Sequence, residues 1–300
     1  MTVRVRVPAK INLHLGVGPL RDDGYHELET VFHAVSLYDE LTAAEGPLSL
    51  TITGEGADEL PVDEDNLVIR AAHALARYAG VAPQAALALH KGIPVAGGMA
   101  GGSADAAAAL VACDGLWGTG LSRRELHGIA ADLGSDVPFA LAGGTALGTG
   151  RGELLSPVLA PRQRHWVIGF ADAGLSTPEV FATLDRLRAE THLPPAPPAE
   201  RLLGELRADS AAGLGAALAN DLQPAALTLR PSLRRSLAAG VDEGALGALV
   251  SGSGPTCFFL AEDASHAVRI AAALAGRGVC RTVRTAYGPV PGARIISSDD

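Results

Sequence analysis

The 300-residue sequence is poor in cysteine, aromatic residues and lysine, and these shortages exclude several classes of protein. Its three cysteines, Cys113, Cys257 and Cys280, lie far apart and form no CxxC motif, so we expect neither a disulfide framework nor a cysteine zinc site. The nine histidines show no HExxH or comparable spacing, which gives no support to a built-in transition-metal site. We therefore predict that all three cysteines are core residues.

Positive charge is also scarce. The net charge is −9, and no cluster of lysine and arginine exceeds a pair such as Arg123-Arg124, so neither nucleic acid nor an anionic membrane is expected as a partner. The first residues, MTVRVRVPAK, alternate charge with valine and lack the apolar core of a signal peptide. No later stretch is long and apolar enough to span a bilayer, and we expect a cytoplasmic protein.

The sequence is rich in apolar residues, at 48%, which is enough for a sizeable core. Helical and strand-like patterns are mixed in both halves, which predicts an α+β protein of two domains. We place the boundary at residue 155, giving domains 1–155 and 156–300, because residues 156–165 contain two prolines and no clear period.

Apolar periodicity and turn residues predict individual elements along the chain. Alternation predicts two strands on either side of a break at residues 8–10, and an apolar stretch after the Asp23-Gly24 turn predicts another through residue 37. Further strands are predicted at 48–53, 85–90, 166–171, 248–250, 257–261 and 281–286, and helices at 66–79, 122–133, 176–187 and 264–275, with a short helix before Gly143-Gly144 and helical patterns up to residue 239.

The most informative stretch is PVAGGMAGGSADAAAALVAC, residues 94–113, where four glycines lead through Ser103 into an alanine-rich helical pattern. Glycine allows positive φ and close approach of the backbone, alanine favours helix, and Ser103 is a good N-cap. Backbone N–H groups and the positive end of the helix dipole would then converge on one point. The stretch predicts a phosphate-binding loop, and a nucleotide as its ligand.

Other interpretations of this loop remain open. It is not a Walker A loop, because no lysine stands beside Ser103, and no GxGxxG register fits it. Its glycines could serve turn geometry alone. Asp105 favours neither interpretation, since a carboxylate in the first helical turn suits the dipole but repels a phosphate on the same amides.

A kinase without a Walker lysine still needs a cation near the transferred phosphoryl group, a residue that holds the acceptor hydroxyl, and Mg²⁺ on the phosphates. Lys10 and Asp136 are the candidates, and Lys10 is one of only two lysines in the chain. Each also has a simpler explanation: Lys10 as a solvated charge at a strand end, and Asp136 as a helix N-cap. The loop at 251–256, SGSGPT, could be a hairpin turn or could approach a ligand.

Taken together, the segments resemble the GHMP kinase superfamily along nearly the whole chain. The matching segments are PAKINLHL at 8–15, RDDGYHELETVFHAVSL at 21–37, NLVIRAA at 66–72, PVAGGMAGGSADAAA at 94–108, LGSDVPFALAGGTALGTGRGE at 133–153, STPEVF at 176–181, NDLQP at 220–224 and SGSGPT at 251–256. The GYHE and SDVPF segments narrow the resemblance to the branch that phosphorylates the cytidine diphosphate derivative of methylerythritol in non-mevalonate isoprenoid biosynthesis.

The resemblance implies a two-domain GHMP kinase fold with the active site in the cleft between the domains, and ATP and Mg²⁺ as cofactors. It implies that Lys10 and Asp136 are the catalytic pair, the aspartate as base or orienter of the hydroxyl. ATP is implied to contact Asn66 and the phosphate loop, residues Pro94, Val95, Ala96, Gly97, Gly98, Met99, Ala100, Gly101, Gly102, Ser103 and Ala104. The substrate is implied to contact Asn12, Tyr25, His26, Phe32, Thr177 and Phe181.

In one respect the sequence departs from the family pattern. Many relatives carry more glycine and a second serine where this chain has Met99-Ala100 and Ala104, so Ser103 is the only hydroxyl in the phosphate loop. Two other kinds of protein would share that loop. A superfamily kinase acting on homoserine or mevalonate would not need the GYHE segment. A catalytically silent nucleotide-binding module would have lost Lys10 or Asp136.

Overall fold

The computed structural model describes residues 1–95, 97–208 and 210–299. Its strands are β1 (Thr2–Leu20), β2 (His26–Ala44), β3 (Ser49–Gly54), β4 (Ala86–Lys91), β5 (Thr145–Thr149), β6 (Leu154–Pro157), β7 (Arg164–Phe170), β8 (Ala219–Asn220), β9 (Gly247–Val250), β10 (Cys257–Ala261), β11 (Thr282–Gly288) and β12 (Arg294–Asp299). Its helices are α1 (Leu67–Ala79), α2 (Gly101–Trp117), α3 (Arg123–Leu133), α4 (Val137–Ala142), α5 (Thr177–Glu190), α6 (Glu200–Arg207), α7 (Ala211–Ala217), α8 (Gln223–Leu229), α9 (Ser232–Asp242) and α10 (Ala264–Gly276), with a 3-10 turn at Ala57–Glu59. The predicted α+β class is confirmed.

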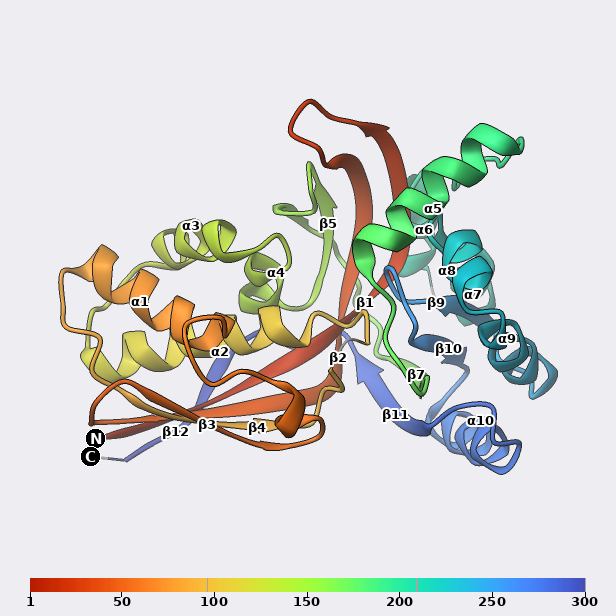
Figure 1. Ribbon diagram of the computed structural model, residues 1–300. Helices are drawn as coiled ribbons and strands as arrows, with labels where there is room; N and C mark the ends of the chain where they lie inside the picture. Colours follow the sequence, from red (N-terminus) through yellow and green to blue (C-terminus); the bar gives the residue numbers. More distant parts are fainter. Residues whose placement is uncertain (96, 209, 300) are drawn as a thin grey trace.

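The described strands form two sheets (Figure 1). The larger sheet has the order β12-β1-β2-β4-β3; β5 also pairs with β2, β6 pairs with β5, and β8 pairs with β1. The smaller sheet has the order β11-β7-β10-β9. Helices α1 to α4 lie on one face of the larger sheet. Helix α5 packs against β1 of the hairpin and against α8, whereas α7 to α10 pack against strands of the smaller sheet and α6 packs against α7. The larger sheet therefore holds the strands of the first half together with β8 and β12 of the second, and the smaller sheet is built from the second half alone.

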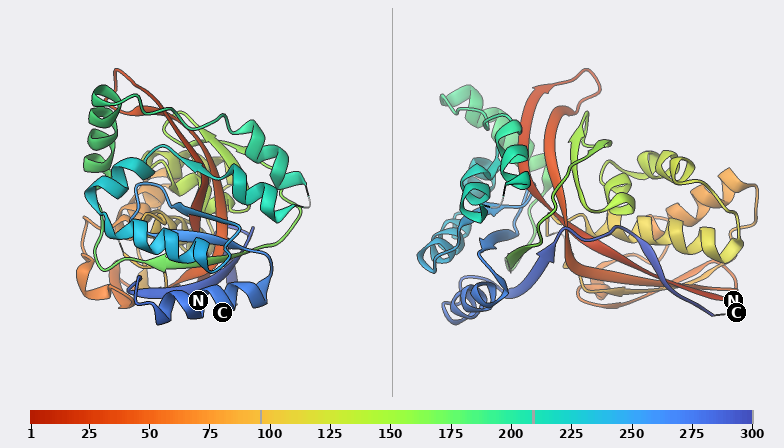
Figure 2. Two further views of the ribbon diagram at one scale, coloured as in Figure 1. Left: turned by 90° about the vertical axis from the view of Figure 1, so that its right-hand side faces the viewer. Right: turned by 180° about the vertical axis from the view of Figure 1, so that it is seen from behind.

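Strands β1 and β2 are the longest elements, and together they connect the two halves. Their upper ends rise as a hairpin between the helices of both halves, while the chain ends lie side by side at the opposite end of the larger sheet (Figures 1 and 2). The predicted break at residues 8–10 is wrong: β1 runs through it, with a register shift against β2 between Pro8 and Ala9. A bulge accommodates the missing N–H of proline without ending a strand, and it re-aims the side chains that follow.

Helix α2 lies at the centre of the first half. Residues 104–109 of this helix are all buried, and all are alanines except Asp105. The alanines pack in one core with Val5, Ile11 and Leu41 of the hairpin. Small side chains let this helix approach the sheet closely, which fixes the position of its N-terminus. The phosphate loop, which leads into α2, is thereby held on a rigid base.

Most of the predicted elements are confirmed, including the strands at 48–53 and 85–90 and the capping box of Ser122 and Glu125 at the start of α3. Cys113 and Cys257 are buried as predicted, but Cys280 is only partly buried. The return strand β12 was not predicted; it pairs with β1, so the end of the chain belongs to the larger sheet. We retain the division into 1–155 and 156–300 as a proposal.

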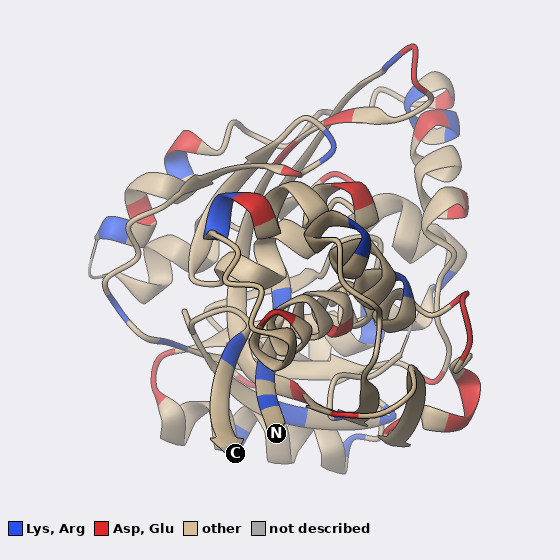
Figure 3. Ribbon diagram, turned by 90° about the vertical axis from the view of Figure 1, so that its left-hand side faces the viewer, with Lys and Arg blue, Asp and Glu red and all other residues tan. Residues whose placement is uncertain are grey.

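On the face that Figure 3 shows, positive and negative segments are interleaved rather than separated by sign. Of the helices in the described part of the chain, none is both long enough and apolar enough to cross a membrane.

Candidate active site

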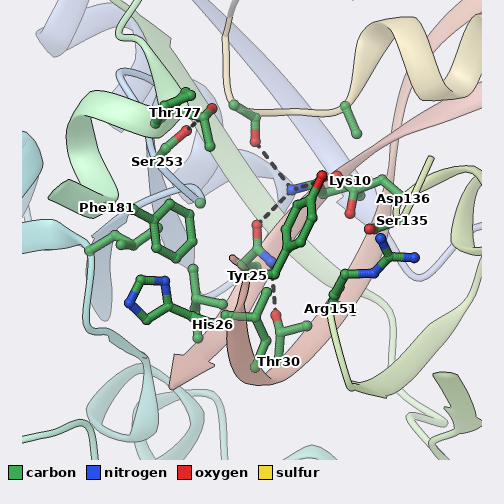
Figure 4. Close-up of a pocket in the computed structure, with 18 of the residues that line it drawn as sticks. Lys10, Tyr25, His26, Thr30, Ser135, Asp136, Arg151, Thr177, Phe181 and Ser253 are labelled. Atoms are coloured by element: carbon green, nitrogen blue, oxygen red, sulfur yellow. Dashed lines mark hydrogen bonds and ion pairs between the residues drawn. The ribbon is translucent and has the colours of Figure 1, made fainter. Parts of the chain in front are cut away.

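A cavity of about 710 Å³ lies where the β1–β2 hairpin, the phosphate loop, α5 and the β9–β10 loop meet (Figure 4). Residues from both halves line it: Lys10 and Gly98 come from the first half, and Thr177 and Ser253 from the second. Figure 4 shows Lys10 and Asp136 on one side of the cavity and Phe181 and His26 on the other.

Lys10 is not a solvated charge, because it is buried in β1, shortly after the register shift between Pro8 and Ala9. Its Nζ donates to Asn12 Oδ1 at 2.8 Å and to the Gly98 carbonyl at 3.4 Å, and it lies 3.5 Å from Asp136 Oδ2. Its backbone N–H donates to the Met99 carbonyl at 3.3 Å. A strand residue is thus joined to the phosphate loop by both its main chain and its side chain, which places a fixed positive charge beside the loop.

Asp136 precedes helix α4 at the N-cap position, as predicted, but its side chain makes no capping hydrogen bond. A capping role therefore does not explain this carboxylate, and its ion pair with Lys10 does. Its side chain is 30% exposed and lines the cavity, so the carboxylate can reach a ligand there.

Asn12 is held in place by a buried chain of hydrogen bonds. Its Nδ2 donates to Thr30 Oγ1 at 2.8 Å, and Thr30 Oγ1 donates to the His14 carbonyl at 2.8 Å. These bonds fix the amide so that its Oδ1 faces Lys10. Since both partners of Asn12 lie on the paired strands β1 and β2, the ammonium is oriented by side chains fixed on the hairpin.

The phosphate loop differs from the prediction at the start of α2. The helix begins at Gly101, three residues earlier than expected, and its N-cap is Ala100 rather than Ser103. Ala100 takes the left-handed conformation, with φ 58°, so the chain turns into the helix before it reaches the serine. Asp105 consequently lies beyond the first turn. No side chain caps α2, which leaves its first N–H groups available to an anion.

The glycines of the loop serve two purposes. At Gly98, where φ is 70°, a Cβ atom would come within 2.6 Å of the Ser251 carbonyl and 2.8 Å of the Gly254 carbonyl, so packing against the β9–β10 loop requires glycine. At Gly102 a Cβ atom would meet only Leu67 Cδ1, at 3.6 Å, and φ is not positive. Turn geometry therefore accounts for Gly98 but not for Gly102, whose exposed position leaves room for a ligand.

Not all of the predicted ATP residues line the cavity. Gly97, Gly98, Ala100, Gly101 and Gly102 line it. Met99 and Ala104 are core residues, Pro94 and Val95 line a smaller neighbouring cavity of about 180 Å³, and Ala96 lies outside the described residues. Asn66 is the N-cap of α1, where its Oδ1 accepts the Val68 N–H at 2.9 Å.

The wall opposite Lys10 is aromatic. The rings of His26 and Phe181 are stacked, with centroids 5.3 Å apart and an angle of 24° between their planes. His26 Nε2 lies 3.0 Å from Asp185 Oδ1, which fixes the histidine ring. Tyr25 is 55% exposed and could cover a second flat ligand face, since it lines the same cavity. These side chains form a site for a planar group.

The remaining predicted substrate residues also reach the cavity. Thr177 Oγ1 lies 2.9 Å from Ser253 Oγ, so α5 and the β9–β10 loop meet at its edge. Phe32 lies beneath Lys10, whose Nζ is 5.5 Å from the ring centroid. The loop at 251–256 is therefore both a hairpin turn and part of the cavity.

Sequence reasoning missed Arg151, which lines the cavity with its guanidinium carbon 5.1 Å from the centroid of the Tyr25 ring. It also missed Asp185 and Ser135 as lining residues, whereas Ser253 lies in the loop at 251–256, which was predicted either to form a turn or to approach a ligand. A signal for Arg151 was present in the matched segment at 133–153, which ends in TGRGE. Within the described part of the chain, no group of three or more metal-ligating side chains is found.

Comparison with known proteins gives consistent matches along the chain. Residues 66–144 match the family model of the GHMP kinases N terminal domain, and residues 202–280 match that of the GHMP kinases C terminal domain. A 4-diphosphocytidyl-2-C-methyl-D-erythritol kinase of Salinispora tropica is 66% identical, over 98% of this chain and 94% of the relative. One of Mycolicibacterium smegmatis is 59% identical, over 98% of this chain and 92% of the relative.

Solved structures agree with these matches. A crystal structure of 4-(cytidine 5'-diphospho)-2C-methyl-D-erythritol kinase superimposes with a TM-score of 0.78 at 35% identity, covering 94% of this chain and 98% of the other. A homoserine kinase from Cytophaga hutchinsonii has a TM-score of 0.74 at 20% identity, over 98% of this chain and 97% of the other, and it shares the fold.

Proposed function

The chain belongs to the GHMP kinases, in the branch of the 4-diphosphocytidyl-2-C-methyl-D-erythritol kinases, and we propose that it transfers the γ-phosphate of ATP to the 2-hydroxyl of 4-diphosphocytidyl-2-C-methyl-D-erythritol. This reaction belongs to the non-mevalonate pathway of isoprenoid biosynthesis. The observation that carries the proposal is the Lys10–Asp136 pair, set at 3.5 Å between an uncapped helix N-terminus and an aromatic wall.

In the proposed reaction the substrate hydroxyl oxygen attacks the γ-phosphorus, the bond from that phosphorus to ADP breaks, and the hydroxyl proton leaves. Asp136 holds the hydroxyl and accepts its proton as the new bond forms. Lys10 neutralises charge that develops on the transferred group, and its hydrogen bonds to Asn12 and Gly98 keep it in place before the reaction.

ATP is proposed to lie with its phosphates on the N-terminus of α2, with Asn66 and the loop from Pro94 to Ala104 around the nucleotide. The uncapped N–H groups and the helix dipole both favour an anion there. We propose that Mg²⁺ enters with ATP. Such an ion commonly keeps phosphate and water ligands and needs few from the protein, which fits the small number of carboxylates lining this cavity.

The cytidine diphosphate part of the substrate is proposed to lie against the aromatic wall. The cytosine ring would stack between Tyr25 and the His26–Phe181 pair, and stacking of this kind contributes about 1 to 3 kcal/mol per base. Asn12, Phe32 and Thr177 would contact the rest of the molecule. Arg151 provides a cation at the mouth of the site, which suits the diphosphate.

ADP release tests the proposal directly. Purified protein with Mg²⁺ and ATP is expected to release ADP with the cytidine substrate and not with homoserine or mevalonate. Turnover of either of those alcohols, with none of the cytidine substrate, would assign the chain to another superfamily activity. ATP binding without turnover of any of the three would indicate a silent nucleotide-binding module.

A further inference from the structure

A second group of charged residues lies beneath the phosphate loop, outside the cavity. Asp39 comes from β2, Lys91 is the last residue of β4, and Asp105 lies in α2. All three are buried, with exposed fractions of 0%, 3% and 4%. Lys91 is the second of the chain's two lysines. Three charged side chains in the core need a specific reason, because burying an unpaired charge is costly.

The two carboxylates share one ammonium but are otherwise unlike. Lys91 Nζ donates to Asp39 Oδ2 at 2.5 Å and to Asp105 Oδ2 at 2.6 Å. Asp39 Oδ1 also accepts the backbone N–H groups of Gly92 and Ile93, at 2.7 and 2.8 Å. Asp105 Oδ1 is buried and has no partner among the described residues. Asp39 is therefore fully bonded as an anion, and Asp105 is not.

The contacts link the group to the loop above it. Gly92 and Ile93 are the two residues that lead into the loop, and Asp39 holds both of their N–H groups. A Cβ atom on Gly101, the first residue of α2, would lie 3.3 Å from Lys91 Nζ. The entrance of the loop and the start of its helix thus both rest on this group.

The charge of the group matters because phosphate is proposed to bind directly above it. With both carboxylates ionised the net charge would be −1, within about one turn of the α2 N-terminus, and it would oppose the helix dipole. Burial raises the pKa of Asp105 well above its ordinary value; Lys91 opposes this, while the charge of Asp39 and a hydrogen bond to it raise the pKa further. Burial lowers the pKa of Lys91, whereas the negative charge of Asp39 and the hydrogen bond that it accepts raise this pKa.

We propose that Asp39, Lys91 and Asp105 form a neutral positioning cluster for the phosphate loop, in which Asp39 carries the negative charge and Asp105 acts as an uncharged hydrogen-bonding group. The inference rests on the proposed function, since it assigns the loop to ATP. It resolves the ambiguity of Asp105 in the sequence: an uncharged Asp105 does not repel the phosphates.

Two isosteric variants separate the two carboxylates. Asp105→Asn keeps an uncharged group in place, so ATP affinity and melting temperature are expected to stay close to those of the wild type. Asp39 accepts hydrogen bonds from the Lys91 ammonium and from two backbone N–H groups, and an uncharged asparagine with one acceptor oxygen cannot replace all three. For Asp39→Asn, ATP affinity is therefore expected to fall roughly tenfold or more. The substrate KM should be unchanged in both variants. A loss of ATP affinity in Asp105→Asn as large as that in Asp39→Asn would overturn the proposal.

A second measurement does not depend on catalysis or on the folding of Asp39→Asn. Infrared difference spectra of the wild type against Asp105→Asn at neutral pH should contain the carbonyl band of a protonated carboxyl group. Absence of that band overturns the neutral cluster even if the wild type is an active kinase. Conversely, presence of the band with no ATP binding by the wild type supports the neutral cluster and contradicts the proposed function.

Discussion

Replacing Asp136 with asparagine tests the catalytic pair most directly, because it removes a charge and leaves the shape. At 3.5 Å from Lys10 Nζ, the carboxylate attracts the ammonium by about 5 kcal/mol at an effective dielectric constant of about 20, and the partial exposure of Asp136 reduces this value. Loss of a positioned base costs roughly 10²- to 10⁴-fold, or about 3 to 5 kcal/mol of activation free energy. We therefore predict a fall of kcat in that range, with both KM values nearly unchanged.

The assay is steady-state ADP release with each substrate varied in turn, supported by single-turnover measurements that isolate the chemical step. Lys10→Ala is expected to cause a comparable loss. Asp185→Asn is the matched control: it removes another carboxylate from the same cavity, but one that pairs with His26 on the substrate side, so it should raise the substrate KM and leave kcat largely unchanged. A folded Asp136→Asn protein with kcat within tenfold of the wild type would remove Asp136 from the mechanism.

Further substitutions probe the two halves of the site. Phe181→Ala removes the stack on His26 and should raise the substrate KM about tenfold or more with little change in KM for ATP; equal effects on both would exclude a substrate-specific role. His26→Ala should also narrow the preference for cytidine over uridine in kcat/KM, because stacking alone hardly distinguishes the two bases; an unchanged preference would assign base selection to another group. Gly102→Val should weaken ATP binding more than it lowers the melting temperature, since Gly102 is exposed and its φ is not positive; equal losses would favour a structural role. Arg151→Gln should raise the substrate KM, and high salt should raise the wild-type KM more than that of the variant; equal salt dependence would contradict a diphosphate contact.

Local signals in the sequence were sufficient to predict an element where a few neighbouring residues determine it. The capping box of Ser122 and Glu125 led to the correct start of α3, because its hydrogen bonds are formed within four residues. The alternating valines indicated the start of β1 because alternation marks a strand with one buried face. The start of α2 could not be predicted in this way. Ser103 has the better N-cap propensity, but packing of Gly98 against the β9–β10 loop and the left-handed conformation of Ala100 start the helix earlier. Tertiary contacts across the two halves override the local preference there.

Long-range pairing explains most of the remaining differences. Strand β12 carries no strong pattern of its own and is fixed by its pairing with β1, which lies almost the whole length of the chain away. Arg151 reaches the cavity only because β5 pairs with β2 and thereby brings the following turn over Tyr25. The family resemblance predicted distant cavity residues only at positions that match its motifs. Arg151 and Asp185 were therefore found only from the three-dimensional structure.

The scarcity of lysine gains a physical meaning in this arrangement. Of 24 basic residues only two are lysines, and both are buried against the phosphate loop or the start of its helix. Lys10 contacts the Gly98 carbonyl on the cavity side, and Lys91 lies beneath Gly101 on the core side. A lysine ammonium is compact and can donate in three directions, whereas the planar guanidinium of arginine needs more space. On the described surface there is room for the larger arginine side chain. At Lys10 and Lys91, by contrast, the charged group must fit beside or beneath a glycine-rich backbone, which a compact ammonium can do. The two ammonium groups thus lie on different sides of this segment, one bonded to the loop beside the proposed reaction centre and one within the core beneath the start of the helix.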